Sequence, residues 1–250
     1  MELYYFSATG NTLTTAKQLA AALGDCKLIP IAALRDMDAI PVTDDAVGFL
    51  FPVYNGDMPY IIRSTIARMK FEGEPYIFAV CTYRGNMGPS GARLNDVLAR
   101  CGQKLSLYQG VSLPGNSWPS SEEHIRTSLA QQSENVKAAA ERIKARETED
   151  YTAELPAPSP FEAGYANVRG VTVDETCIGC GTCATVCPMG NIELTDSRAE
   201  IGSKCLTCLA CFHWCPVEAI YMANGGDSAR RTKYHHPDVT LDDIIAQKSL

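Results

Sequence analysis

Eight of the eleven cysteines lie between Cys177 and Cys215, at spacings that suit metal clusters. They form two tandem copies of the pattern C-x2-C-x2-C-x3-C-P, at residues 177–188 and 205–216. Three closely spaced thiolates can bind three irons of a cubane, while the fourth, set apart and followed by proline, reaches the other cluster. The repeat therefore predicts two 4Fe-4S clusters.

The crosswise pattern divides the eight thiolates into two ligand sets. The predicted ligands of one cluster are Cys177, Cys180, Cys183 and Cys215, and those of the other are Cys205, Cys208, Cys211 and Cys187. Structural zinc or disulfides are the alternatives, but zinc sites usually use separated C-x2-C pairs, and disulfides belong mainly to secreted chains. A c-type haem is excluded because no histidine follows the third cysteine of either copy. We expect His213 and Trp214 to pack around a cluster.

The second candidate site is SATGNT at residues 7–12. It follows the apolar run Leu3–Phe6 and precedes apolar residues at helical spacing that end at Gly24. Hydroxyls, backbone N–H groups and the positive end of a helix bind phosphate without lysine or arginine. The missing lysine argues against a nucleotide-hydrolysing loop. An ordinary capped helix terminus is the alternative.

Strand and helix patterns alternate through residues 1–147. Further strands are expected at 46–51, 76–81 and 105–113, and helices at 58–69, 90–101 and 120–146. Strands separated by helices imply right-handed crossovers and a mostly parallel sheet covered on both faces. The predicted fold class is α/β, a doubly wound parallel sheet.

A proline-rich stretch separates this region from the cysteine repeat. Pro156, Pro158 and Pro160 stand among acidic and small residues, a composition typical of a semi-rigid linker. The predicted division is a first domain at 1–147, a linker at 148–172, a cluster domain at 173–225 and a tail at 226–250. We expect the tail to hold the two domains together, with its acidic residues Asp238, Asp242 and Asp243 starting a short helix.

The N-terminal motif resembles the flavodoxin phosphate loop, [ST]-x-T-G-x-T. Together with the two cysteine motifs after it, the chain resembles the flavodoxin–ferredoxin fusion electron carriers of anaerobic microbes. This resemblance covers nearly the whole chain. It implies a flavodoxin-like sheet that binds FMN, followed by a small α+β two-cluster ferredoxin-like domain.

The same resemblance implies where the flavin lies. In flavodoxin-like domains the ring sits between the loops after the third and fourth strands, here residues 51–59 and 81–88. Long flavodoxins have a tryptophan and acidic residues there, whereas this chain has Tyr54 and Arg84. Trp118 is a candidate to close over the ring. The implied FMN-binding residues are Ser7, Thr9, Gly10, Asn11, Thr12, Pro52, Val53, Tyr54, Asn55, Gly56, Thr82, Tyr83, Arg84, Gly85, Asn86 and Asn116.

Whole-chain composition limits the remaining function classes. With 46% hydrophobic and 20% charged residues the chain is a folded protein, and its net charge of −7 disfavours nucleic acid. Its longest apolar run, Ala46–Tyr54, is too short to span a membrane. No secretory signal begins the sequence, so the cytoplasm is expected. The oligomeric state stays open.

We therefore expect an electron carrier that passes electrons between FMN and two 4Fe-4S clusters and exchanges them with redox partner proteins. No dinucleotide fingerprint, catalytic triad or paired-carboxylate site favours another chemistry. The alternatives are a flavin-dependent reductase of a small organic substrate, fed by the clusters, and a redox sensor without catalysis.

Overall fold

The first domain is built on one parallel sheet. A computed structural model describes residues 1–250. Five strands pair in the order β2-β1-β4-β6-β7, which is the flavodoxin-like order of a doubly wound sheet. The expected fold class is confirmed. The strands are β1 (Glu2–Tyr5), β2 (Lys27–Pro30), β4 (Ala46–Pro52), β6 (Tyr76–Tyr83) and β7 (Leu107–Ser112).

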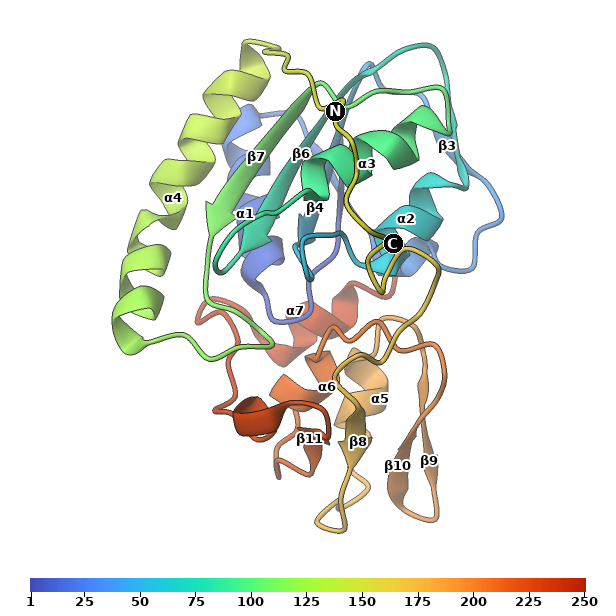
Figure 1. Cartoon of the computed structure of the whole chain (residues 1–250), viewed down its shortest axis with the longest axis vertical. Helices are drawn as coiled ribbons and strands as arrows, with labels where there is room; N and C mark the ends of the chain where they lie inside the picture. Colours follow the sequence, from blue (N-terminus) through green and yellow to red (C-terminus); the bar gives the residue numbers. More distant parts are fainter.

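Helices cover both faces of this sheet (Figure 1). On one face lie α1 (Asn11–Leu23) and α4 (Glu122–Lys144), which pack against each other. On the other lie α2 (Tyr60–Ile66) and α3 (Ser90–Ala99). Because both faces are covered, six of the seven residues of β4 are buried, which explains its unbroken apolar sequence.

Two local features differ from the predicted elements. The expected helix at 58–69 ends early, since Met69–Phe71 forms a strand, β5, that pairs in parallel with β3 (Ile40–Val42). The edge strand β2 has no predicted counterpart, because KLIP begins with an exposed lysine and ends at a proline. A short 3-10 helix, Ile31–Leu34, follows it.

The cysteine repeat folds into a small α+β unit beyond the carboxyl end of the sheet (Figure 1). Each copy contains a short helix, preceded by a residue with positive φ: Gly181 at 78° and Leu209 at 63°. Two antiparallel strand pairs, β8–β11 and β9–β10, complete the unit. These elements are β8 (Val171–Val173), α5 (Thr182–Val186), β9 (Ile192–Thr195), β10 (Arg198–Ile201), α6 (Ala210–His213) and β11 (Ile220–Met222).

The segment at 148–172 packs along the first domain. Phe161 is buried there, with its ring centroid 6.1 Å from that of Tyr54. Arg93 of α3 forms an ion pair with Glu162 at 2.9 Å. Apolar burial and this ion pair hold the proline-rich stretch to the first domain.

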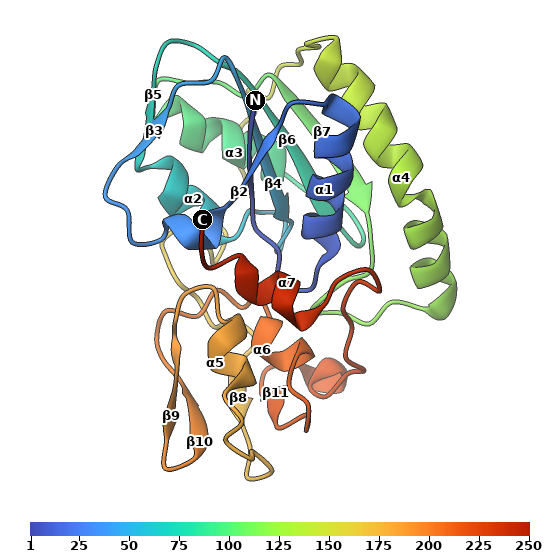
Figure 2. The ribbon, with the colours of Figure 1, turned by 180° about the vertical axis from the view of Figure 1, so that it is seen from behind.

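The tail lies across the junction of the two domains. It contains a 3-10 turn at Gly226–Ser228 and the helix α7 (Leu241–Ala246), which Figure 2 shows between the sheet and the cysteine unit. Thr240 and Asp243 form a capping box that starts α7. No helix of the structure has the length and apolarity needed to cross a membrane.

Candidate functional site

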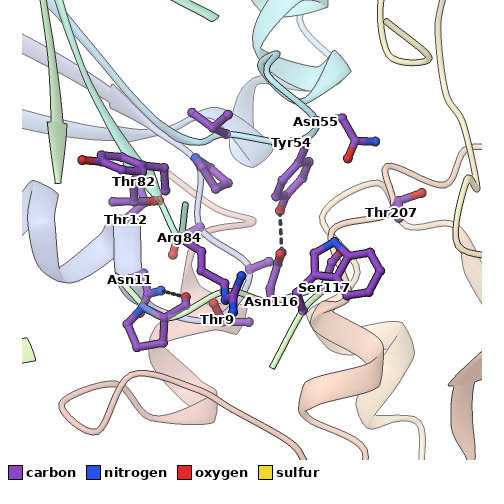
Figure 3. Close-up of a pocket in the computed structure, with 18 of the residues that line it drawn as sticks. Thr9, Asn11, Thr12, Tyr54, Asn55, Thr82, Arg84, Asn116, Ser117 and Thr207 are labelled. Carbon is purple, nitrogen blue, oxygen red and sulfur yellow. Dashed lines mark hydrogen bonds between the residues drawn. The ribbon is translucent and has the colours of Figure 1, made fainter. Parts of the chain in front are cut away.

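A cavity opens where the carboxyl ends of β1, β4 and β6 face the cysteine unit (Figure 3). Its empty volume, mouth included, is about 770 Å³. Twelve of the sixteen residues implied for FMN line it, namely Ser7, Thr9, Asn11, Thr12, Pro52, Val53, Tyr54, Asn55, Thr82, Tyr83, Arg84 and Asn116. The other four, Gly10, Gly56, Gly85 and Asn86, do not line it.

The loop at 7–12 presents free backbone donors at this cavity. The N–H groups of Thr9, Asn11 and Thr12 make no hydrogen bond within the protein, as expected at a helix N-terminus. Gly10 has a φ of 94°, and its N–H donates to Ser7 Oγ at 3.1 Å. The positive φ keeps the turn tight, so that unpaired donors and a helix dipole are available to an anion.

Side chains of the same loop fix it to its surroundings. The hydroxyls of Thr12 and Thr82 are hydrogen-bonded at 2.8 Å. Asn11 donates to the Pro114 carbonyl at 2.8 Å, and its side-chain oxygen accepts from the Tyr234 hydroxyl at 2.8 Å. Asn11 therefore joins three segments, which is a positioning role that the motif alone does not reveal.

Tyr54 forms the wall of the cavity from the loop after β4. It is 7% exposed, and burial raises the pKa of its hydroxyl well above the usual value. The following turn has positive φ at both Asn55 and Gly56, 50° and 71°. Asp57 is fully buried and pairs with Arg63 at 3.2 Å, so its carboxylate is neutralised outside the cavity.

The mouth of the cavity carries cations and no carboxylate. Arg84 and Arg169 both line it, and neither guanidinium has a hydrogen-bond acceptor or an ion-pair partner in the protein. Arg169 lies over the Trp118 ring at 4.4 Å. Arg231 donates to the Gly115 carbonyl nearby, and burial together with Arg84 lowers its pKa to about 10.

The eight repeat cysteines line two further cavities of about 320 and 360 Å³. Each cavity receives three cysteines of one copy and the fourth of the other. The first is lined by Cys177, Cys180, Cys183 and Cys215, and the second by Cys205, Cys208, Cys211 and Cys187. The donor chemistry and the four-thiolate count suit one cubane in each cavity.

Comparisons with known proteins agree with the cysteine motif. Residues 176–219 match the family model of the 4Fe-4S dicluster domain. A ferredoxin from Pyrobaculum islandicum is 32% identical over 74 residues, which cover 28% of this chain and 69% of that one. The chain belongs to the 4Fe-4S ferredoxins. Joined to its flavodoxin-like sheet, the chain is a flavodoxin–ferredoxin fusion.

Two other similarities are more limited. The subunit Rpo3 of the DNA-directed RNA polymerase of Methanosarcina mazei is 39% identical over 61 residues, so the fusion spans only 23% of that relative's length. The two-electron reduced flavodoxin of Megasphaera elsdenii superposes with a TM-score of 0.38 at 14% identity, over 56% of this chain and 98% of that one. The strand order, rather than this superposition, carries the fold assignment.

Asn116 bridges the two halves of the fusion. Its side-chain amide donates to the Tyr54 hydroxyl at 3.1 Å, drawn in Figure 3, and to the Cys208 carbonyl at 3.0 Å. The backbone carbonyl oxygen of Asn116 lies 2.8 Å from His213 Nε2. Because the Tyr234 N–H donates to His213 Nδ1, the Nε2 atom carries the proton and donates to Asn116.

His213 and Trp214 therefore lie at the domain interface. Trp214 donates to the Ala8 carbonyl at 3.1 Å and stacks on His235 with centroids 4.4 Å apart. His213 is buried and bonded to the loop after β7. Sequence reasoning missed these contacts, and it missed the linker and ferredoxin residues of the cavity, since their sequences carry no ligand signature. The lining residues not named individually are Ala8 of the loop at 7–12, Pro114, Gly115 and Ser117 beside Asn116, and, in the linker and the cysteine unit, Phe161, Val168, Arg169 and Thr207.

Proposed function

We propose that this fusion passes electrons between FMN, held in the cavity at the sheet, and two 4Fe-4S clusters held crosswise by the eight cysteines. Bound FMN exchanges two electrons, and each cluster exchanges one. The fusion then links one-electron carriers to a two-electron reaction. The boundaries proposed for its parts are 1–147, 148–172, 173–225 and 226–250.

Phosphate recognition falls to the loop at 7–12. Free N–H groups at Thr9, Asn11 and Thr12, with the positive end of α1, favour a dianion without a basic side chain. The hydroxyl of Thr9 is the further donor, since that of Thr12 is already paired with Thr82. These features support FMN rather than riboflavin as the ligand.

The isoalloxazine ring is assigned to the space between Tyr54 and the loop that begins at Tyr83. Tyr54 is held from behind by Phe161 and Asn116, so the cavity wall is rigid before a ligand enters. A preformed wall lowers the conformational entropy lost on binding. Gly85 and Asn86 stay outside the cavity, and for them we propose only a loop-shaping role.

The observation that carries the proposal is the Asn116 bridge. One amide joins the tyrosine of the flavin cavity to the backbone of Cys208, a predicted cluster ligand. Cys208 is also part of the same apolar core as the sheet. The second cysteine set, Cys205, Cys208, Cys211 and Cys187, is thereby the one nearest the flavin.

Replacement of Asn116 tests this arrangement. The variant Asn116→Leu removes both donors at similar volume, whereas Asn86→Leu makes the same change on an exposed loop outside the cavity. Both proteins are purified without oxygen and assayed for iron, sulfide and flavin. We expect unchanged cluster content in both, and a several-fold slower electron exchange between cluster and flavin after laser-flash reduction only in Asn116→Leu. Equal rates of electron exchange in both variants would show that the Asn116 bridge is not part of the path between cluster and flavin.

One observation favours the reductase as a second candidate. Arg84 and Arg169 leave two unpaired guanidiniums at the cavity mouth, where they suit an anionic organic substrate above the flavin. Turnover of small carboxylate acceptors by the reduced fusion, lost in Arg169→Gln and kept in Arg198→Gln, would support a reductase. No turnover of any such acceptor supports the carrier.

A further inference from the structure

The tail places a lysine against the apolar core of the cysteine unit. The Lys233 ammonium lies 3.2 Å from the centroid of the Phe212 ring, which is completely buried. The same ammonium donates to the Ile220 carbonyl at 3.4 Å. Lys233 is itself half-buried, and no carboxylate forms an ion pair with it. An aromatic face and a carbonyl therefore hold a cation here without neutralising its charge.

The Phe212 ring lies between this cation and cysteines of both cavities. It belongs to the apolar core of the cysteine unit, and cysteines of both cavities are part of that core or pack against it. Cys183 and Cys215 line the first cavity, and Cys187 and Cys211 line the second. Charges separated by packed apolar side chains are screened far less than charges separated by water. The charge of the ammonium therefore acts on both cavities.

Lys233 is tied more closely to the first cavity than to the second. Ile220, whose carbonyl it contacts, lines the first cavity and not the second. Burial lowers the pKa of the Lys233 ammonium, whereas Glu218, Cys215 and, more weakly, Cys211 raise it. Cys215 belongs to the first cavity and Cys211 to the second. Negative charge in the first cavity therefore interacts more strongly with the lysine.

The neighbouring charges of the tail are engaged elsewhere. Arg230 pairs with Asp174 at 2.5 Å, so its charge is neutralised locally. Arg231 donates to a backbone carbonyl at the mouth of the flavin cavity. Glu218 is exposed, and its carboxylate offsets part of the lysine charge from the solvent side. Lys233 is thus the tail cation that acts on the cysteine unit, and it lies outside residues 176–219, which match the dicluster family.

We propose that Lys233 stabilises an electron added to the cluster of the first cavity, so that the tail sets which of the two clusters is reduced first. Reduction adds one electron and makes the cluster more negative, while no bond forms or breaks and the lysine keeps its proton. Net charge is one of the factors that set the reduction potential of a cluster. A fixed cation beside an apolar core favours the reduced form. The inference rests on the proposed function for the presence of two clusters.

Removal of the charge tests the proposal. Lys233→Gln and Lys233→Met both remove it, and the methionine keeps an apolar chain over the Phe212 ring. Lys233→Arg keeps the charge. Lys137→Gln is the matched control, because Lys137 is an exposed lysine of α4, away from the cysteine unit. Each full-length protein is purified without oxygen, assayed for iron and sulfide, and titrated with dithionite in the presence of redox mediators, with electron paramagnetic resonance as the readout.

We expect both charge-free variants to lower the equilibrium constant for reducing the first cluster by about threefold to tenfold, where tenfold corresponds to about 59 mV in potential. The second cluster should shift less, and the Cys187→Ala background, which keeps the first cysteine set complete, assigns the signals. Lys233→Arg and Lys137→Gln should leave both potentials nearly unchanged. Glu218→Gln should shift the first cluster in the opposite direction, because it removes the carboxylate that offsets the lysine.

An unchanged first-cluster potential in the charge-free variants would overturn the proposal, as would a larger shift at the second cluster or an equal shift in Lys137→Gln. Loss of iron and sulfide in both charge-free variants would show that the lysine is structural, and would overturn it as well. The potentials are measured on the clusters and need no flavin. An unmodified protein without two clusters would sink the proposed function, whereas two clusters with unmoved potentials would sink this inference alone.

Discussion

The Tyr234 hydroxyl lies 2.8 Å from the side-chain oxygen of Asn11, although the two residues are 223 positions apart. The tail thus contacts the phosphate loop directly. His236 adds a backbone hydrogen bond from its N–H to the Thr9 carbonyl at 2.8 Å. Lys248, farther along, donates to the Thr185 carbonyl of the ferredoxin domain at 3.0 Å. The tail fastens one domain to the other at the site itself.

Gln247→Leu should destabilise the junction. The Gln247 amide accepts from the Ser7 N–H and donates to the Ser7 carbonyl, both at 3.1 Å in a buried environment. Each backbone group left buried and unpaired costs about 1–3 kcal/mol. We expect a lower free energy of unfolding in urea. Gln103→Leu is the control, because the side-chain amide of Gln103 donates an exposed hydrogen bond to the Gly73 carbonyl, and its loss should change this free energy by less than about 1 kcal/mol. Equal losses would contradict the role of the tail as a strap that holds the two domains together.

Thr9→Val should weaken FMN but not riboflavin. The substitution removes a hydroxyl at the phosphate loop while keeping the β-branched shape. A hydrogen bond to a charged group contributes about 1.5–3 kcal/mol, so the FMN dissociation constant should rise about tenfold to a hundredfold. Flavin fluorescence titration measures both ligands. A matching loss of riboflavin affinity would mean that the hydroxyl acts on the loop and not on phosphate.

Two cysteine variants separate the clusters. Cys187→Ala should damage the cluster of Cys205, Cys208 and Cys211, because Cys187 lies in their cavity. Cys215→Ala should damage the other cluster for the same reason. The unmodified protein should hold about eight irons and eight sulfides. Electron paramagnetic resonance of the reduced variants identifies the cluster that each one loses, and damage confined to the mutated copy would refute the crosswise arrangement.

Stability should fall in mild acid because of His236. Burial lowers the pKa of its imidazole, while Asp238 raises it and His235 lowers it further. Its Nε2 faces Gln132 Oε1 at 2.9 Å, and the Asp238 N–H donates to its Nδ1 at 3.2 Å, so it is held neutral. The unfolded chain binds a proton near pH 6.5 and the folded one only at lower pH. Its stabilisation is therefore full above about pH 6.5 and is lost as pH falls below that value.

Urea unfolding at several pH values checks this assignment. His236→Gln keeps a polar amide at the same place and cannot gain the proton. We expect its stability to depend less on pH between about 7.5 and 5.5 than that of the unmodified protein. His124→Gln serves as the control, because the His124 side chain, on α4, makes no hydrogen bond to the tail. Parallel pH profiles for His236→Gln and the unmodified protein would count against His236.

Local signals made much of the fold predictable. The loop at 7–12 stands between a strand and a helix, and its glycine has the positive φ that the turn needs. Cysteine spacing predicted two sets of four that the structure places in two cavities, although ligation itself stays a prediction. Alternating strand and helix patterns predicted the parallel sheet, because each crossover between parallel strands is a short connection that is local in the sequence.

Contacts between distant segments could not be predicted in the same way. Asn116 has two partners, Tyr54 and Cys208, that only the packing of the domains brings together. Phe161 reads as part of a linker, yet it is 1% exposed beneath Tyr54. Neither Asn116 nor Phe161 belongs to a periodic pattern or a motif, because the residues that each one contacts lie in other elements. Arg169 reaches the cavity for the same reason, and nothing in its local sequence indicates it.

The strap also sets an order of events during synthesis. The phosphate loop leaves the ribosome well before Val239, which lies against Gly10. At a rate of synthesis of about 5–20 residues per second, the loop is made on the order of ten to fifty seconds before Val239. The first domain can fold in that time, before the tail is present to contact its loop at 7–12. The loop therefore first folds without the hydrogen bonds that Tyr234 and His236 later form with it.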